Sequence, residues 1–177
     1  MKPKICLIVL FLISLASLVN AASAPIEKFA VLNEYQPNEV YIPVDFYTGV
    51  FSTDAGNKIA RTLIKFDLSA FKGKEISSAK LVLKVQLTKE GTTTEPQTLE
   101  IYSITGPWAD ATWNTAPSYS GIVQAYVTIT TDGSYEIDLT PLVQTWITNP
   151  NANYGILLKS ADESNLNFKQ FMADSYL

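Results

Sequence analysis

The stretch Ala79-Lys-Leu-Val-Leu-Lys-Val-Gln-Leu-Thr88 decides the fold class, because apolar and polar side chains alternate along it. Leu81, Leu83, Val85 and Leu87 fall on one face, and lysine, glutamine and threonine side chains fall mostly on the other. A period of two over this length is typical of an antiparallel strand with one buried face.

Similar segments lie on either side of this strand. Arg61–Leu68 alternates in the same way, and Val40–Ser52 is rich in Val, Ile, Tyr and Phe, with Pro43 and Gly49 marking an edge, a bend or a turn. Runs of Thr, Ser, Gly, Pro and Asn separate the remaining candidates, as in all-β domains. These candidates are Gln97–Thr105, Val123–Thr130, Ser134–Leu139, Tyr154–Ser160 and Phe168–Ala173, with a tight turn at Thr131–Ser134.

One segment breaks the strand pattern. Thr140 offers a hydroxyl for an N-cap, and Pro141 suits the first helical position. Apolar side chains then recur at helical spacing up to Asn149-Pro150, so we expect one short helix with Trp146 turned inward. The pattern predicts an all-β fold, a two-sheet antiparallel β-sandwich of jelly-roll type with one short helix.

The first 21 residues have the composition of a secretory signal peptide. Lys2 and Lys4 precede the apolar run Ile5–Val19, and Val19-Asn20-Ala21 supplies the small residues of a cleavage site. The run is shorter than the ~20 residues that span a bilayer. We therefore predict residues 1–21 as a signal peptide, residues 22–177 as a single β-sandwich domain, and a secreted, extracellular or cell-surface protein without membrane association after cleavage.

The composition excludes several classes of chemistry. The chain has no His, and its one Cys, Cys6, lies in the predicted signal peptide. Residues 22–177 therefore lack the side chains for disulfides, for Ser-His-Asp or Cys-His catalysis, and for His- or Cys-based zinc and copper sites. Arg61 is the single Arg, and the formal net charge is −4, so nucleic acid is not an expected partner.

No cofactor is predicted, with calcium as the open alternative. A Ca²⁺ ion would take oxygen ligands, and the spacing matches no EF-hand loop. The candidates form no preferred set of ligands: they are Asp54, Gly56 and Asn57 in one loop, and Asp132 or Asp162 elsewhere.

Four ordered segments carry a resemblance to a known family. They are Arg61–Ser69 with Ile76–Leu83, Trp108–Pro117, Ile137–Trp146 and Asn153–Ser160. In order and spacing the chain resembles the DNRLRE (disaggregatase-related) domain family, which is classed among carbohydrate-binding modules. The resemblance covers roughly Val31 to Ala173. It implies a secreted β-sandwich that is usually attached to polysaccharide-active enzymes or surface proteins, and it brings no catalytic residues.

The chain departs from that family in two ways. Members usually lie beside a catalytic or anchoring domain, whereas this domain stands alone. The family pattern also closes with another short strand after Phe168–Asp174, and this chain stops at Leu177. We therefore expect either a truncated sequence or a sandwich that lacks its last strand. An open sheet edge is a template for pairing, and the segment Ala22–Tyr35 of another subunit could fill it.

An irregular loop holds the first group of candidate ligand-binding residues. Aromatic faces stack on sugar rings, while carboxylates and amides read hydroxyl groups. The group comprises Trp108, Asp110, Trp113, Asn114 and Tyr119. In the alternative, both Trp side chains plug the end of the sandwich, and Asp110 and Thr112 bond the loop backbone.

Tyr41 and Tyr47 form the second group. They share one parity, while Val40, Ile42, Val44 and Phe46 share the other, so the two Tyr rings are expected on an exposed face. Such a pair could contact a glycan or a neighbouring subunit, or could have no specific role.

The adjacent carboxylates Asp162-Glu163 are interpreted as a solvated turn, because no second acid is fixed at the separation that glycosidases require.

The sequence thus predicts a secreted, non-catalytic polysaccharide-binding module at the cell surface or in the extracellular matrix, and not an enzyme. The alternative is a structural subunit of an extracellular filament or surface assembly that polymerises by β-strand donation.

Overall fold

The computed structural model describes residues 22–87 and 92–172, which form nine β-strands and one α-helix. The predicted signal peptide lies outside these residues. The strands are β1 (Ile26–Asn33), β2 (Phe46–Thr53), β3 (Gly56–Phe66), β4 (Lys80–Val85), β5 (Gln97–Ile104), β6 (Tyr119–Ile129), β7 (Gly133–Asp138), β8 (Ile156–Ser160) and β9 (Lys169–Phe171). The helix α1 spans Thr140–Thr148, and two 3₁₀ turns cover Ser69–Phe71 and Pro150–Ala152.

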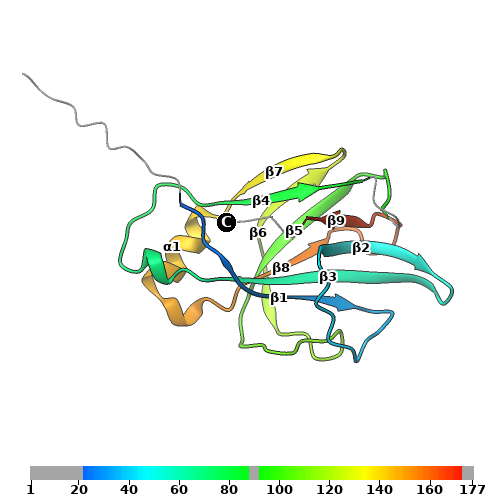
Figure 1. Cartoon of the computed structure of the whole chain (residues 1–177), viewed down its shortest axis with the longest axis horizontal. Coiled ribbons are helices and arrows are strands. Elements are labelled where there is room, and N and C mark those ends of the chain that lie inside the picture. The colour runs from blue at the N-terminus through cyan, green and yellow to red at the C-terminus, as the bar shows by residue number, and fades with distance from the viewer. Residues whose placement is uncertain (1–21, 88–91, 173–177) are drawn as a thin grey trace, which may run out of the picture.

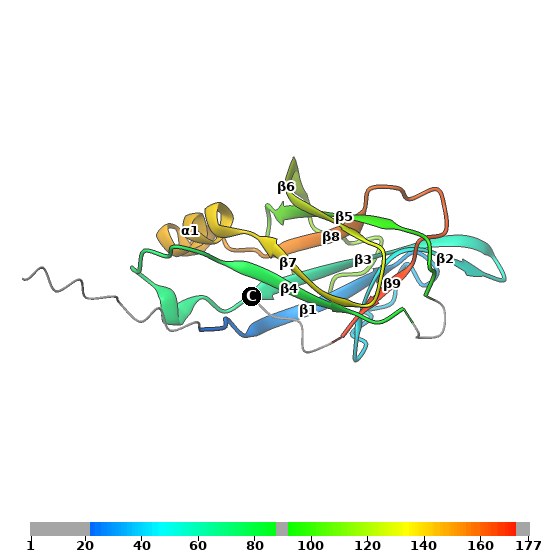
Figure 2. The same cartoon turned by 90° about the horizontal axis from the view of Figure 1, so that it is seen from above.

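All strand pairs are antiparallel and build two layers (Figures 1 and 2). The order β6-β5-β8-β3-β2-β9-β4-β7, with β1 also on β3, gives a nearly closed sheet. β2 belongs to both layers, because Gly49–Thr53 pair with β3 while Phe46–Thr48 pair with β9. The prediction of an all-β antiparallel sandwich with one short helix is confirmed.

The main core lies between the two layers. Leu81, Leu83 and Val85 of β4 are buried there, as their alternation predicts, opposite Ile64 and Phe66 of β3. α1 closes one end of the sandwich, at the left of Figure 1, with Trp146 buried as expected. The burial of these apolar side chains provides the main stabilisation of a domain without disulfides.

The first long strand is shorter than predicted. β2 begins at Phe46, and residues 40–45 are irregular, so the expected alternation fails there. Val40, Ile42 and Val44 are exposed, Val44 by 84%. Pro43 has no N–H to donate to a ladder, which explains why the pairing of β2 begins only after it, at Phe46.

β1 is a strand that the sequence pattern did not reveal as part of this sandwich. It pairs with β3 from Ile26–Phe66 to Asn33–Ala60. Ala30, Val31 and Leu32 are consecutive and all buried, which hides the period of two. β1 belongs to the segment Ala22–Tyr35 that was considered for donation to another subunit. In this structure it pairs with β3 of its own chain.

The helix begins differently from the prediction. Leu139, not Thr140, is the N-cap residue, and no side chain caps the helix. The Thr140 hydroxyl accepts from the Ala79 N–H over 2.9 Å and donates to Asp138 over 2.6 Å. The prediction that Thr140 caps the helix is thus wrong, because its hydroxyl is already hydrogen-bonded to Ala79, just before β4, and to Asp138. Over the described residues, no helix has the length and apolar character to cross a membrane.

Candidate functional site

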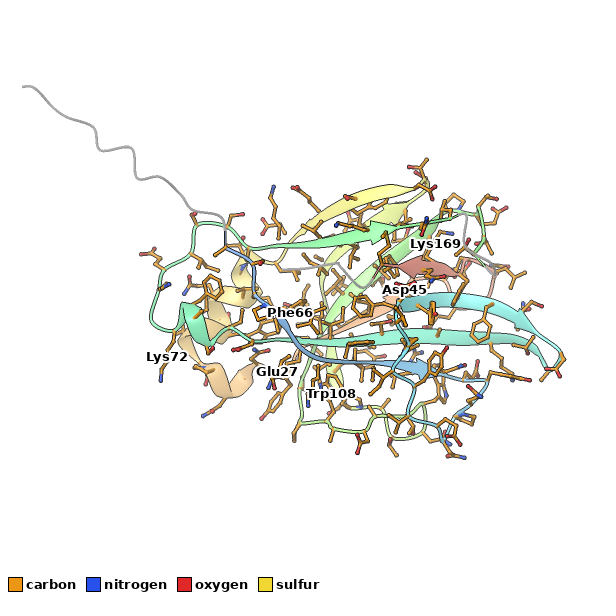
Figure 3. All side chains as sticks on the ribbon, in the orientation of Figure 1. Glu27, Asp45, Phe66, Lys72, Trp108 and Lys169 are labelled. Atoms are coloured by element: carbon orange, nitrogen blue, oxygen red, sulfur yellow. The ribbon has the colours of Figure 1, made fainter. Side chains whose placement is uncertain are left out.

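Residues 108–119, which we call the Trp loop, pack through Trp108 on the outer face of the β1-β3-β8-β5-β6 layer, not at an end of the sandwich. Trp108 is labelled in Figure 3. Trp108 is only 9% exposed and packs against Ala30, Leu63 and Leu157. Its indole N–H donates to the Tyr154 carbonyl over 2.8 Å. The Trp108 ring therefore has a packing role, as in the alternative interpretation of the loop. It covers the outer face of the sheet, however, and does not plug the end of the sandwich.

Trp113 is half-buried beneath a charged group. The Arg61 guanidinium lies 4.8 Å from its ring centre and donates twice to the Glu163 carboxylate, each over 2.7 Å. Lys159 approaches the same carboxylate at 3.7 Å. Hydrogen bonding to Glu163 raises the pKa of Arg61, against an opposing effect of burial. The Arg61 guanidinium thus contacts the Trp113 ring and the Glu163 carboxylate, and Glu163 also faces Lys159.

The polar residues of the loop bind one another or the connection between β1 and β2. Asn114 donates its backbone N–H to the Pro37 carbonyl, and its side-chain amide donates to the Asn38 side chain over 2.9 Å. Thr112 exchanges hydrogen bonds with Thr115. Asp110 is exposed. Tyr119 packs edge-on against Tyr102, with ring centres 5.2 Å apart.

The second predicted group is part of a longer aromatic row. We call Tyr41, Tyr47, Phe168 and Phe51 the aromatic row. Ring centres are 6.2 Å apart from Tyr41 to Tyr47, 5.5 Å from Tyr47 to Phe168, and 5.4 Å from Phe168 to Phe51. The first two steps are stacked at 26°, and all four side chains are partly exposed.

Sequence reasoning missed half of this row. Phe51 lies four residues after Tyr47 in the same strand, so its parity could have been read. Phe168 comes from the segment before β9, and only the pairing of β2 with β9 brings it beside Tyr47.

A polar cleft of about 610 Å³ adjoins the row. Three connections meet there at the right-hand end of the molecule in Figure 1: the β2–β3 hairpin, the segment before β5 and the β8–β9 loop. The cleft and the row meet where Leu166 and Asn167 line the cleft and Phe168 follows them. The lining residues carry carboxylates, amides and a hydroxyl beside two apolar side chains; they are Asn57, Glu95, Pro96, Asp162, Ser164, Asn165, Leu166 and Asn167.

Asn167 holds the β8–β9 loop in place. Its side-chain oxygen accepts from the Val50 N–H over 2.9 Å, and its amide donates to Ser160 and to the Asp162 carbonyl. Gln97, fully buried, donates to the carbonyls of Thr48 and Asn167. These bonds connect the cleft wall to β2 and β5, which makes the cleft a built feature and not a gap between loops.

Lys169 holds the opposite wall. It is 0% exposed, and its ammonium donates to the carbonyls of Thr93 and Glu95, each over 2.7 Å. Burial lowers the pKa of Lys169, with a weaker opposing effect of Glu95 and Tyr135. The lysine thereby fixes the segment that carries Glu95 and Pro96 over the end of β9.

The remaining acidic candidates act locally. Asp162 accepts from the backbone N–H of Ser164 over 2.8 Å and from the Asn165 amide over 2.8 Å, and these bonds lower its pKa. Asp54 accepts from the Tyr35 hydroxyl over 2.9 Å. Within residues 22–87 and 92–172, no group of three or more acidic side chains is placed to hold a metal ion.

The comparison with known families identifies the type of module. The model of carbohydrate-binding module family 96 matches residues 48–175, from β2 past β9. The chain belongs to carbohydrate-binding module family 96. The matched residues include two members of the aromatic row, Phe51 and Phe168, together with the whole cleft lining and the Trp loop of this family 96 domain. No curated protein matches the chain.

Proposed function

We propose that the protein is a secreted, non-catalytic module that binds polysaccharide along the aromatic row and in the polar cleft beside it. The observation that carries this proposal is their junction, where Phe168 follows the cleft residues Leu166 and Asn167 directly. Membership of a carbohydrate-binding family supports the ligand class. The apolar run and cleavage site at residues 1–21 support secretion to the cell surface or matrix.

Each part of the site would make a different contribution. Partly exposed aromatic rings offer apolar faces to the C–H faces of sugar rings, and the neighbouring amides and carboxylates accept or donate hydrogen bonds to hydroxyl groups. Because Asn167, Gln97 and Lys169 fix the walls beforehand, little ordering cost remains for binding.

The aromatic row is favoured over the Trp loop for a geometric reason. Trp108 is buried, and the Trp113 ring is covered by Arg61. Asp110, Asn114 and Tyr119 stay available at the loop surface, so this loop remains a second candidate for sugar contact.

Affinity electrophoresis of residues 22–177 through gels containing single polysaccharides tests the proposal. We expect at least one polysaccharide to retard the protein, and Tyr47→Ala to weaken that retardation about tenfold or more. Tyr126→Ala is the matched control, because Tyr126 is a 71% exposed tyrosine on β6 outside the row. Loss of binding in Trp113→Ala, with Tyr47→Ala unaffected, would move the site to the Trp loop.

The structural alternative, a subunit that assembles by strand donation, has one observation in its favour. β9 is three residues long and, among the described residues, its register meets β4 only at the pair Phe171–Val85. β9 lies inside the sheet between β2 and β4, and a ladder this short is where an additional strand would pair. Light scattering over a range of concentrations tests this alternative: assembly that deletion of Ala22–Tyr35 abolishes would support it, and a monomer at all concentrations would reject it.

A further inference from the structure

β6 is an edge strand whose second side is open. It spans eleven residues, of which seven are exposed, and within the described part of the chain its only ladder is with β5. That ladder skips Ile122, whose N–H donates to the Ser120 hydroxyl over 3.1 Å and whose carbonyl accepts from the Gln124 amide over 3.0 Å. The backbone groups of Ile122 are thus held by short-range side-chain bonds, which the backbone of a partner strand can replace at small net cost.

β6 lacks the charged side chains that normally protect such an edge. Residues 111–131 include no charged side chain, although the chain has 13 basic and 17 acidic residues. Two other strands pair with a single neighbour, and both carry charges: Glu136 and Asp138 on β7, Glu27 and Lys28 on β1. Charges on an edge oppose pairing with another chain, so β6 is the edge where this barrier is missing.

Two large apolar side chains stand on the outside of this edge. Ile122 is 72% exposed and Tyr126 is 71% exposed. Ala125 and Val127 of the same strand pack against the main core, so the strand has an inner face that is used within the domain and an outer face that is not. Burial of Ile122 and Tyr126 against a partner would stabilise a complex.

The order of the side chains makes β6 complementary to a second copy of itself. In an antiparallel pair with a two-fold axis at Gln124, Ile122 of each copy lies opposite Tyr126 of the other, and Ser120 lies opposite Thr128. Aromatic–β-branched pairs and hydroxyl pairs are favourable across strands. An uncharged strand also meets its copy without local like-charge repulsion, although the net charge of each chain is −4.

We infer that β6 is a homodimerisation edge, where two copies pair antiparallel about a two-fold axis near Gln124. This inference goes beyond the proposed function and differs from strand donation, because each chain keeps its own strands and the assembly closes at two copies. One strand edge forms a small interface, below about 1,200 Å², so we expect a dissociation constant of about 1–100 µM.

Sedimentation equilibrium of residues 22–177, from about 1 to 500 µM, tests the inference by mass action. We expect the average mass to rise from that of a monomer and to level off at two copies. Ile122→Lys should weaken the dimer at least about tenfold. Val44→Lys is the control, because Val44 is an exposed apolar residue outside β6. Melting temperatures equal to the native value will show that both variants are folded.

A cysteine variant tests the register. Residues 22–177 contain no Cys, so Gln124→Cys introduces a single thiol. Opposite residues of an antiparallel pair have Cα atoms about 4.5–5.5 Å apart, which a disulfide can bridge. Mild oxidation should therefore give a covalent dimer on a non-reducing gel. Ser134→Cys, exposed on β7, should stay monomeric at the same concentration.

Three results would overturn the inference. They are a monomer at every concentration, equal dimerisation of Ile122→Lys and Val44→Lys, and equal cross-linking of the two cysteine variants. Growth beyond two copies that requires Ala22–Tyr35 would also overturn it, in favour of strand donation. None of these results depends on polysaccharide binding, so the inference and the proposed function are tested separately.

Discussion

Lys169 and Glu95 are 74 residues apart in sequence, yet the ammonium of one donates to the backbone carbonyl of the other over 2.7 Å. A second bond of equal length reaches Thr93. One buried side chain of β9 thus holds the segment that forms a wall of the cleft. Buried cations persist where several acceptors satisfy them, and here two carbonyls and a hydroxyl do so.

Lys169→Met should loosen that wall. The variant keeps an apolar stem of similar length but leaves the carbonyls of Thr93 and Glu95 without their donor, which costs about 1–3 kcal/mol for a buried group. We expect the free energy of unfolding in urea to fall by that amount and sugar binding to weaken. Lys72→Met, at the exposed position labelled at the other end of the molecule in Figure 3, is the control. Equal urea midpoints for the two variants would contradict the assigned role.

Gly155 and Gly56 should respond differently to alanine. Both have positive φ, +96° and +89°, so each substitution carries a backbone cost of about 1 kcal/mol. At Gly155 a Cβ would also overlap the Ile64 carbonyl oxygen, whereas at Gly56 nothing lies within 4 Å. We expect Gly155→Ala to reduce the yield of folded protein or lower its melting temperature severely, and Gly56→Ala to lower it by a few degrees. Similar melting temperatures would mean that β3 yields at Ile64.

The Arg61–Glu163 pair should show measurable coupling. Its side chains are 20% and 18% exposed and form two parallel bonds of 2.7 Å, a geometry stronger than an ordinary surface pair. A double-mutant cycle with Arg61→Met and Glu163→Gln should give a coupling of about 1–2 kcal/mol in urea unfolding. Coupling near zero would show that Lys159, at 3.7 Å from Glu163, replaces Arg61 in the variant.

Tyr102 should make the fold sensitive to alkali. Burial, followed by a hydrogen bond to Glu100, raises the pKa of Tyr102 to about 12. Because the folded pKa lies above the unfolded value of about 10, the unfolded chain loses this proton first, and stability falls as pH rises from about 10 to about 12. Melting temperatures across that range should fall less steeply in Tyr102→Phe. Tyr126→Phe, on exposed β6, should follow the native curve.

The sequence determined the fold class because its periodicity is local. Leu81, Leu83 and Val85 recur at every second position, which predicts one buried face of β4, and helical spacing predicts that Trp146 is buried. The same logic placed Tyr41 and Tyr47 together, although it gave Val40–Asp45 a regularity that Pro43 prevents. β1 escaped recognition because both of its faces are covered and no alternation results.

The candidate site depended on tertiary structure. Phe168 reaches Tyr47 only because β9 pairs with β2, and Glu95 comes close to Lys169 only when the segment before β5 folds over β9. The cleft likewise joins side chains from three connections that are distant in sequence. Periodicity indicates which face of a single strand is buried. The order of the strands in a sandwich depends on the packing of all strands together. The junction of the aromatic row with the cleft therefore appears only in the folded chain.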